Sequence, residues 1–178
     1  VGAIHNDKRL AIDERHLGLV PGHEDPFCAE KIQLLSQAIE QQVNLDDIIN
    51  IADQSPTLAT STPILFPKSE TPGPTANITL GLVRNAAFGF YYPDDIQAFK
   101  QAGVKIIEID PFVDTQLPDI DALFIGGGFP ETSMEKLEKN TSLRQAIKTA
   151  INNGLPAYAE CGGLMYLARS IEWNKRTH

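Results

Sequence analysis

The sequence has few cysteines, a deficit of positive charge and no long apolar run. Only Cys28 and Cys161 occur among 178 residues, which argues against a disulfide-stapled secreted scaffold and favours a reducing, cytoplasmic compartment. Fifteen lysines and arginines stand against 23 aspartates and glutamates, so neither nucleic acid nor an anionic membrane is expected as the main partner. No apolar stretch approaches the roughly 20 residues that span a bilayer. The first residues also lack the basic-then-apolar order of a signal peptide.

Phosphate-binding signatures and histidines are also scarce. The glycine run 126–128 is not followed by Gly-Lys-Ser/Thr, so it is no Walker P-loop, and the spacing of a dinucleotide fingerprint is absent. The four histidines are His5, His16, His23 and His178. A cysteine nucleophile normally needs a histidine base, and a residue at the end of a chain is a poor one. Any hydrolytic role for this chain therefore lacks an evident base.

The composition divides the chain into two blocks and a linker. Residues 1–53 predict one short strand at 17–20 and two helices, at 28–43 and from Leu45 onward. These elements cannot close a core alone, so we interpret the block as the C-terminal piece of a larger α/β domain. Residues 54–77 contain five prolines and read as a linker, with Ile64–Phe66 as a short docked strand.

Strands and helices alternate over residues 78–178. Apolar runs predict strands at 78–83, 104–109, 122–125 and 155–158, separated by helices at 93–102 and 143–151. Thr132 and Glu135 have the spacing of a capping box for a further short helix. This alternation predicts an α/β fold with a mostly parallel sheet and helices on both faces. Sites in such folds lie at the carboxyl ends of the strands.

Cys161 follows the last predicted strand, in the run Ala-Glu-Cys-Gly-Gly. Small residues at 159 and 163 suit a tight strand-to-helix turn, in which larger side chains would collide across the turn. The dipole of a following helix favours the thiolate, and the N–H of Gly162 would face an oxyanion formed on a bound carbonyl. An inert, buried cysteine is the alternative, and the pattern leaves both open.

Two other segments carry candidate functional residues. Gly126–Gly128 allows close backbone approach and would supply a second oxyanion N–H if its strand neighbours that of Cys161; otherwise it is a flexible turn. Four aromatic residues follow the first strand of this block, and they either line a pocket for a large planar partner or pack in the core. They are Phe88, Phe90, Tyr91 and Tyr92.

Four segments together resemble the cobyrinic acid a,c-diamide synthase family. They are Ala159–Leu167, Gly126–Glu131, Ala87–Pro93 and Asp13–Pro21, and the resemblance covers nearly the whole chain in order. It implies a class I glutamine amidotransferase fold, flavodoxin-like, over 78–178. It also implies that 1–53 is the end of the ATP-dependent synthetase domain that precedes the amidotransferase in this family.

The resemblance also implies a reaction and its residues. Glutamine would be hydrolysed at Cys161 through a thioester, with an oxyanion hole near Gly127, Gly128 and Gly162. The ammonia would amidate side-chain carboxylates a and c of a corrin acid, which ATP and Mg²⁺ activate. The family's P-loop would precede Val1 and its catalytic histidine would follow the elbow helix. We therefore expect an internal piece of a synthase, with no metal site, no bound ATP and little glutaminase activity alone.

Other interpretations remain open at this stage. A related enzyme acting on another tetrapyrrole, such as cobyric acid synthase, shares the amidotransferase fold. A non-catalytic binding module could retain the elbow cysteine without a base, and a thiol hydrolase would also require a histidine. The oligomeric state, a homodimer included, is left undecided.

Overall fold

The computed structural model describes residues 1–12, 14–15, 18–22, 24–56 and 77–178. The expected strand at Ile64–Phe66 and nearly all of the expected linker lie outside the described residues. The chain divides into two compact units, Val1–Phe66 and Pro67–His178, and each is described by itself. No helix in the described ranges is long and apolar enough to cross a membrane.

The first unit is a small set of helices with a two-stranded hairpin. Its elements are η1 (Lys8–Leu10), β1 (Glu14–Arg15), β2 (Gly18–Leu19), α1 (Cys28–Gln42) and α2 (Leu45–Asp53). Strands β1 and β2 pair antiparallel. Both predicted helices are confirmed, and the strand predicted at 17–20 is found at Gly18–Leu19, with Leu17 outside the described residues. The Asn44 side chain caps α2 by accepting from the Asp47 N–H. Among the residues of this unit whose burial is described, only Ala38 is buried, so these residues enclose little core.

The second unit is built on a four-stranded parallel sheet in the order β4-β3-β5-β6. The strands are β3 (Thr79–Val83), β4 (Lys105–Ile109), β5 (Ala122–Ile125) and β6 (Ala157–Ala159). Its helices are α3 (Pro93–Gln101), the 3₁₀ turn η2 (Pro130–Ser133), α4 (Met134–Lys139), α5 (Thr141–Asn152) and α6 (Gly162–Tyr166). The antiparallel pair β7 (Glu172–Trp173) and β8 (Arg176–Thr177) comes last and was not predicted.

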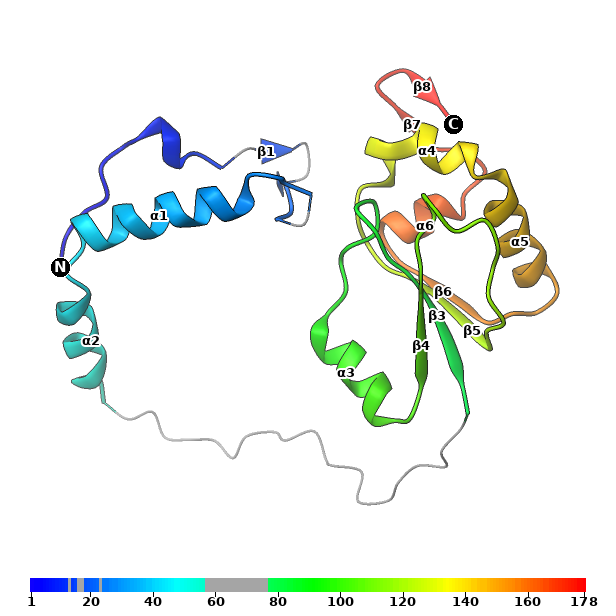
Figure 1. Ribbon diagram of the computed structural model, residues 1–178, viewed down its shortest axis with the longest axis horizontal. Helices are drawn as coiled ribbons and strands as arrows, with labels where there is room; N and C mark the ends of the chain where they lie inside the picture. Colours follow the sequence, from blue (N-terminus) through cyan, green and yellow to red (C-terminus); the bar gives the residue numbers. More distant parts are fainter. Residues whose placement is uncertain (13, 16–17, 23, 57–76) are drawn as a thin grey trace. The chain divides into compact units, whose positions relative to one another are not determined.

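Helices cover both faces of this sheet, as Figure 1 shows. Successive strand residues point to opposite faces. On one face Leu80, Leu82 and Phe124 pack with Phe99 of α3. The other face buries a larger cluster with α4 and α5, and Tyr166 of α6 packs against it. The cluster includes Val83, Ile109, Leu123, Ile125, Leu137, Leu143 and Ile147. The predicted α/β class with a parallel sheet is therefore confirmed.

Most helices of this unit begin or end at residues that favour a helix terminus. Pro93 begins α3, and Gly103 (φ 80°) and Gly154 (φ 99°) take left-handed conformations after α3 and α5. Asn140 caps α5 by accepting from the Leu143 N–H.

The predicted capping box is wrong. Pro130 starts a 3₁₀ turn in which the Thr132 hydroxyl donates to the Phe129 carbonyl at 2.8 Å. Because of this turn α4 starts only at Met134, and its cap residue Ser133 makes no side-chain capping bond.

Candidate active site

Cys161 lies in a sharp turn between β6 and α6. Its backbone has φ 48° and ψ −115°, a left-handed conformation that costs a non-glycine residue free energy and is therefore concentrated at functional sites. The turn holds an exposed thiol at the carboxyl end of the strand, as expected for a nucleophile elbow. The alternative of a buried core cysteine does not apply.

The two glycines after Cys161 allow α6 to pack closely against the end of β5 and the backbone that follows it. A Cβ built on Gly163 would lie 2.2 Å from the Ile125 carbonyl oxygen, and one on Gly162 would lie 2.6 Å from the Gly128 oxygen. Glycine is therefore required at both positions by the neighbouring strand end. This packing sets where the helix starts and hence where the elbow points.

The glycine run lies beside the elbow because β5 and β6 are adjacent, with Ile125 opposite Ala159. A Cβ on Gly127 would lie 3.5 Å from the Cβ of Cys161. Gly128 in turn approaches the Ala87 carbonyl so closely that a Cβ would lie 2.0 Å from its oxygen. The structure thus brings together Cys161 and the three glycines that the sequence singled out.

Backbone N–H groups beside Cys161 are the candidate hydrogen-bond donors for an oxyanion. Gly162 is the first residue of α6, and N–H groups in a helix's first turn have no acceptor within the helix. The carbonyl of Gly127 accepts from the Phe90 N–H at 3.1 Å, so the peptide group after Gly127 is held by a backbone hydrogen bond. Such fixed donors suit an oxyanion that forms next to the sulfur.

The aromatic residues after β3 divide between packing inside the protein and lining a cavity. Phe88 is fully buried and packs against Tyr166 with ring centroids 5.3 Å apart. Phe90 contacts Phe129 edge to face, whereas Tyr92 is 73% exposed. Tyr91 hydrogen-bonds to the last residue of β3 and to the first residue after β5, a role that the sequence did not suggest. Only Tyr92 of these four lines the cavity described next.

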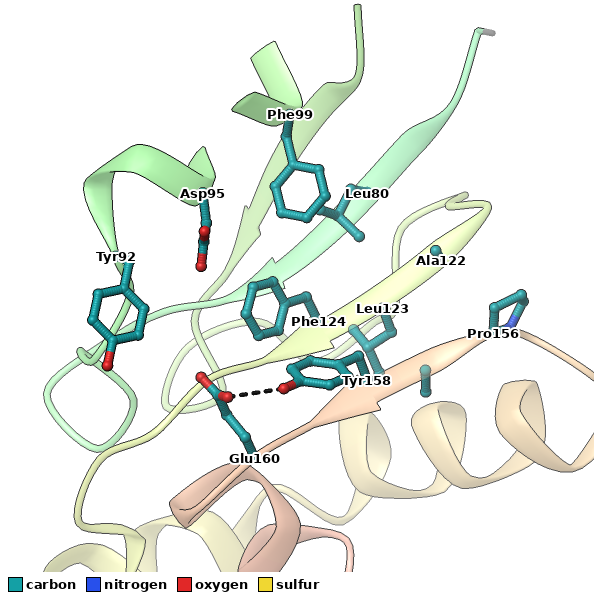
Figure 2. A pocket seen from close by; sticks show the side chains of 11 residues that line it. Leu80, Tyr92, Asp95, Phe99, Ala122, Leu123, Phe124, Pro156, Tyr158 and Glu160 are labelled. Carbon is teal, nitrogen blue, oxygen red and sulfur yellow. Dashed lines mark hydrogen bonds between the residues drawn. The ribbon is translucent and has the colours of Figure 1, made fainter. Parts of the chain in front are cut away.

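A cavity of about 500 Å³ lies on the α3 face of the sheet (Figure 2). It is lined by Leu80, Tyr92, Asp95, Phe99, Ala122, Leu123, Phe124, Pro156, Ala157, Tyr158 and Glu160. At one end the Tyr158 hydroxyl donates to the Glu160 carboxylate at 3.0 Å, which raises the pKa of Tyr158. Cys161 is not among the lining residues, although it follows Glu160 directly. The sequence suggested a pocket at the aromatic run, but it did not indicate this lining, because the other rings, Phe99, Phe124 and Tyr158, come from separate elements.

His178, the histidine of the second unit, is paired with an acidic side chain. The ring Nδ1 of His178 lies 2.7 Å from the Glu138 carboxylate, and this contact lowers the pKa of Glu138. His5 belongs to the first unit, and His16 and His23 lie outside the described residues. Within the described ranges no group of three or more His, Cys, Asp or Glu side chains could hold a metal ion.

Curated proteins named cobyrinate a,c-diamide synthase are similar to nearly the whole chain. The relative from Magnetococcus marinus is 36% identical over 182 residues, covering 97% of this chain and 37% of the relative. The Dehalococcoides mccartyi relative is 42% identical over 175 residues, with the same two coverages. The chain therefore spans little more than a third of the length of these relatives. No solved structure is significantly similar to it.

A family model covers the second unit and its elbow. The model of the CobB/CobQ-like glutamine amidotransferase domain matches residues 79–178, which include the whole parallel sheet, the glycine run and Cys161. This is the region for which the sequence indicated an amidotransferase fold. The chain belongs to the CobB/CobQ-like glutamine amidotransferase family.

Proposed function

We propose that this chain carries the glutaminase site of an amide-forming synthase, with Cys161 as the nucleophile. The observation that carries the proposal is the exposed thiol on a left-handed elbow, set against the backbone of Gly127 and Gly162. Family membership supports the same reaction class, since the matched domain is a glutamine amidotransferase. A site of this kind suits acyl transfer, because the nucleophile would attack the carbonyl carbon while neighbouring backbone N–H groups bind the carbonyl oxygen.

The chemistry follows from the elbow and its neighbours. The Cys161 thiolate attacks the side-chain amide carbon of glutamine, and the carbonyl oxygen takes up the negative charge. N–H groups of Gly127, Gly128 and Gly162 stabilise this oxyanion more strongly than they bind the ground-state carbonyl. The C–N bond then breaks, the nitrogen leaves as ammonia after gaining a proton, and a thioester remains. Water hydrolyses the thioester to glutamate and restores the thiol.

For the whole protein we propose glutamine-dependent amidation of the a and c carboxylates of cobyrinic acid, in the cytoplasm. The names of the relatives support this substrate. Such a synthase would use ATP and Mg²⁺ to activate the carboxylates. The residues here do not fit those groups: the sequence has no Walker P-loop, and the described part has no metal-ligating cluster. We therefore derive no step through them. We propose residues 1–53 as the end of the synthetase domain and 78–178 as amidotransferase.

The test uses the full-length gene product with a corrin acid, ATP and either glutamine or ammonia. Cys161→Ala should abolish glutamine-dependent amidation and leave ammonia-dependent amidation intact, because only the release of ammonia needs the thiol. Cys28→Ala is the matched control and should keep both activities. Retention of glutamine use by Cys161→Ala would show that another group is the nucleophile. Loss of both activities in that variant would contradict the proposed division of labour.

A further inference from the structure

Tyr91 joins the ends of two adjacent strands beside the elbow. Its hydroxyl donates to the carbonyl of Val83, the last residue of β3. The same hydroxyl accepts from the N–H of Gly126, the first residue after β5, at 2.9 Å. The pairing of β3 with β5 ends at Val83 and Ile125, so one side-chain oxygen continues the connection where the ladder stops.

The ring of Tyr91 is also held by contacts with its neighbours. It stands edge to face with Phe124, with centroids 5.2 Å apart. It also lies against the backbone of Gly126, where a Cβ would come within 2.6 Å of the ring. Burial raises the pKa of Tyr91 to about 12. The phenol therefore stays protonated, and able to donate to Val83, throughout the neutral range.

The held segment is the one that faces the nucleophile. Gly127 follows Gly126 directly, and its carbonyl accepts from the N–H of Phe90, the residue before Tyr91. Tyr91 thus holds Gly126 through its side chain, and Phe90 holds Gly127 through its backbone N–H. Gly127 also lies close to Cys161, since a Cβ added to the glycine would be 3.5 Å from the cysteine Cβ and 3.3 Å from the Phe90 Cβ.

We propose that Tyr91 is a positioning residue that sets the distance between the Gly126–Gly128 backbone and the sulfur of Cys161. It touches neither the sulfur nor a bound carbonyl, and it acts through Gly126 and Gly127. This inference rests on the proposed function of the elbow as a glutaminase. An oxyanion donor works only when it is already in place as charge develops, so loss of the hydroxyl should slow the chemical step and leave substrate binding in place.

The test compares two tyrosines in the full-length gene product. Tyr91→Phe removes a hydroxyl with two backbone partners. Tyr166→Phe is the matched control, because burial also raises the pKa of Tyr166 to about 12, yet its buried hydroxyl has no hydrogen-bond partner in the described part of the chain. The measurements are glutaminase kcat, KM for glutamine, and the rate at which iodoacetamide alkylates Cys161.

We expect Tyr91→Phe to lower kcat by about 10- to 100-fold, less than the loss of a whole oxyanion donor. The KM for glutamine and the alkylation rate should stay at wild-type values, since neither depends on the oxyanion. Tyr166→Phe should match wild type in all three. Wild-type kcat in Tyr91→Phe, or an effect on KM alone, would overturn the inference.

Hydrogen exchange in the unmutated protein gives a second measurement that needs no catalysis. The Gly126 amide should exchange slowly, because the Tyr91 hydroxyl accepts its proton, and fast exchange would overturn the inference even where Tyr91→Phe fails to fold. A wild-type protein without glutaminase activity but with a protected Gly126 amide would refute the proposed function and leave the Tyr91 bridge in place. The two failures are therefore distinguishable.

Discussion

Replacing Gly163 with alanine should damage both stability and catalysis, although the position is helical. Alanine is the better helix former by about 1 kcal/mol, which alone would favour the variant. The new Cβ, however, would lie 2.2 Å from the Ile125 oxygen, 2.8 Å from the Ile125 carbonyl carbon and 2.9 Å from the Gly126 oxygen. All three are backbone atoms of a strand end, so no flexible side chain can move aside.

The size of the effect follows from that geometry. The shortest contact is about 1.2 Å below the 3.4 Å at which ordinary contact begins, so the start of α6 must move away from β5 by about 1 Å. Overpacking costs about 1–3 kcal/mol, and the upper part of that range applies against rigid backbone. After the gain in helix propensity we expect a net loss of about 2 kcal/mol in the free energy of unfolding. A displacement of 1 Å at a catalytic group costs about 100-fold in rate.

Urea unfolding and glutaminase kinetics on the full-length gene product check both values. Gly154→Ala is the control: a Cβ there meets open space, but φ is 99°, so alanine costs about 1–2 kcal/mol through the backbone alone. It should destabilise the protein and leave kcat per folded molecule unchanged. Full stability and activity in Gly163→Ala would refute the close approach. Equal loss of kcat in both variants would show that activity follows stability and not the position of the elbow.

Three further predictions use other parts of the structure. Iodoacetamide should alkylate the exposed Cys161 faster than the partly buried Cys28; equal slow rates, by mass spectrometry, would count against an activated elbow. Asn140→Ala should lower the free energy of unfolding by about 1–2 kcal/mol in urea, because the side chain caps α5; an unchanged midpoint would contradict this. Glu160→Gln should lower the pKa of Tyr158, since the carboxylate's hydrogen bond favours the neutral phenol; an unshifted phenolate absorbance titration would show that this bond is absent in solution.

Much of the second unit can be predicted from residue pattern. The apolar runs that became β3, β4 and β5 were evident because buried parallel strands are nearly continuous in apolar residues. Pro93 marked a helix start through local chemistry alone. The capping box failed because Pro130 tightened the chain into a 3₁₀ turn, and local propensity did not show that this turn would delay α4.

The sequence could name the candidate site residues, but it could not predict the distances between them. Cys161 and its glycines could be named from the run around them, because a strand followed by small residues and a helix has few conformations. That Gly163 faces the Ile125 carbonyl depends on β5 lying next to β6. Sheet order is a long-range property, and no local pattern encodes it.

The amino-acid order alone thus indicated most of the helices and strands, the α/β class and the candidate elbow segment, since each depends largely on interactions between near neighbours in the chain. The packing of the folded sheet added what connects distant segments: the contact of the glycine run with Cys161, the Tyr91 bridge from β3 to β5, and the aromatic cavity beside Glu160. These features join residues tens of positions apart. They exist only once the strands have paired in their order and the helices have covered the two faces.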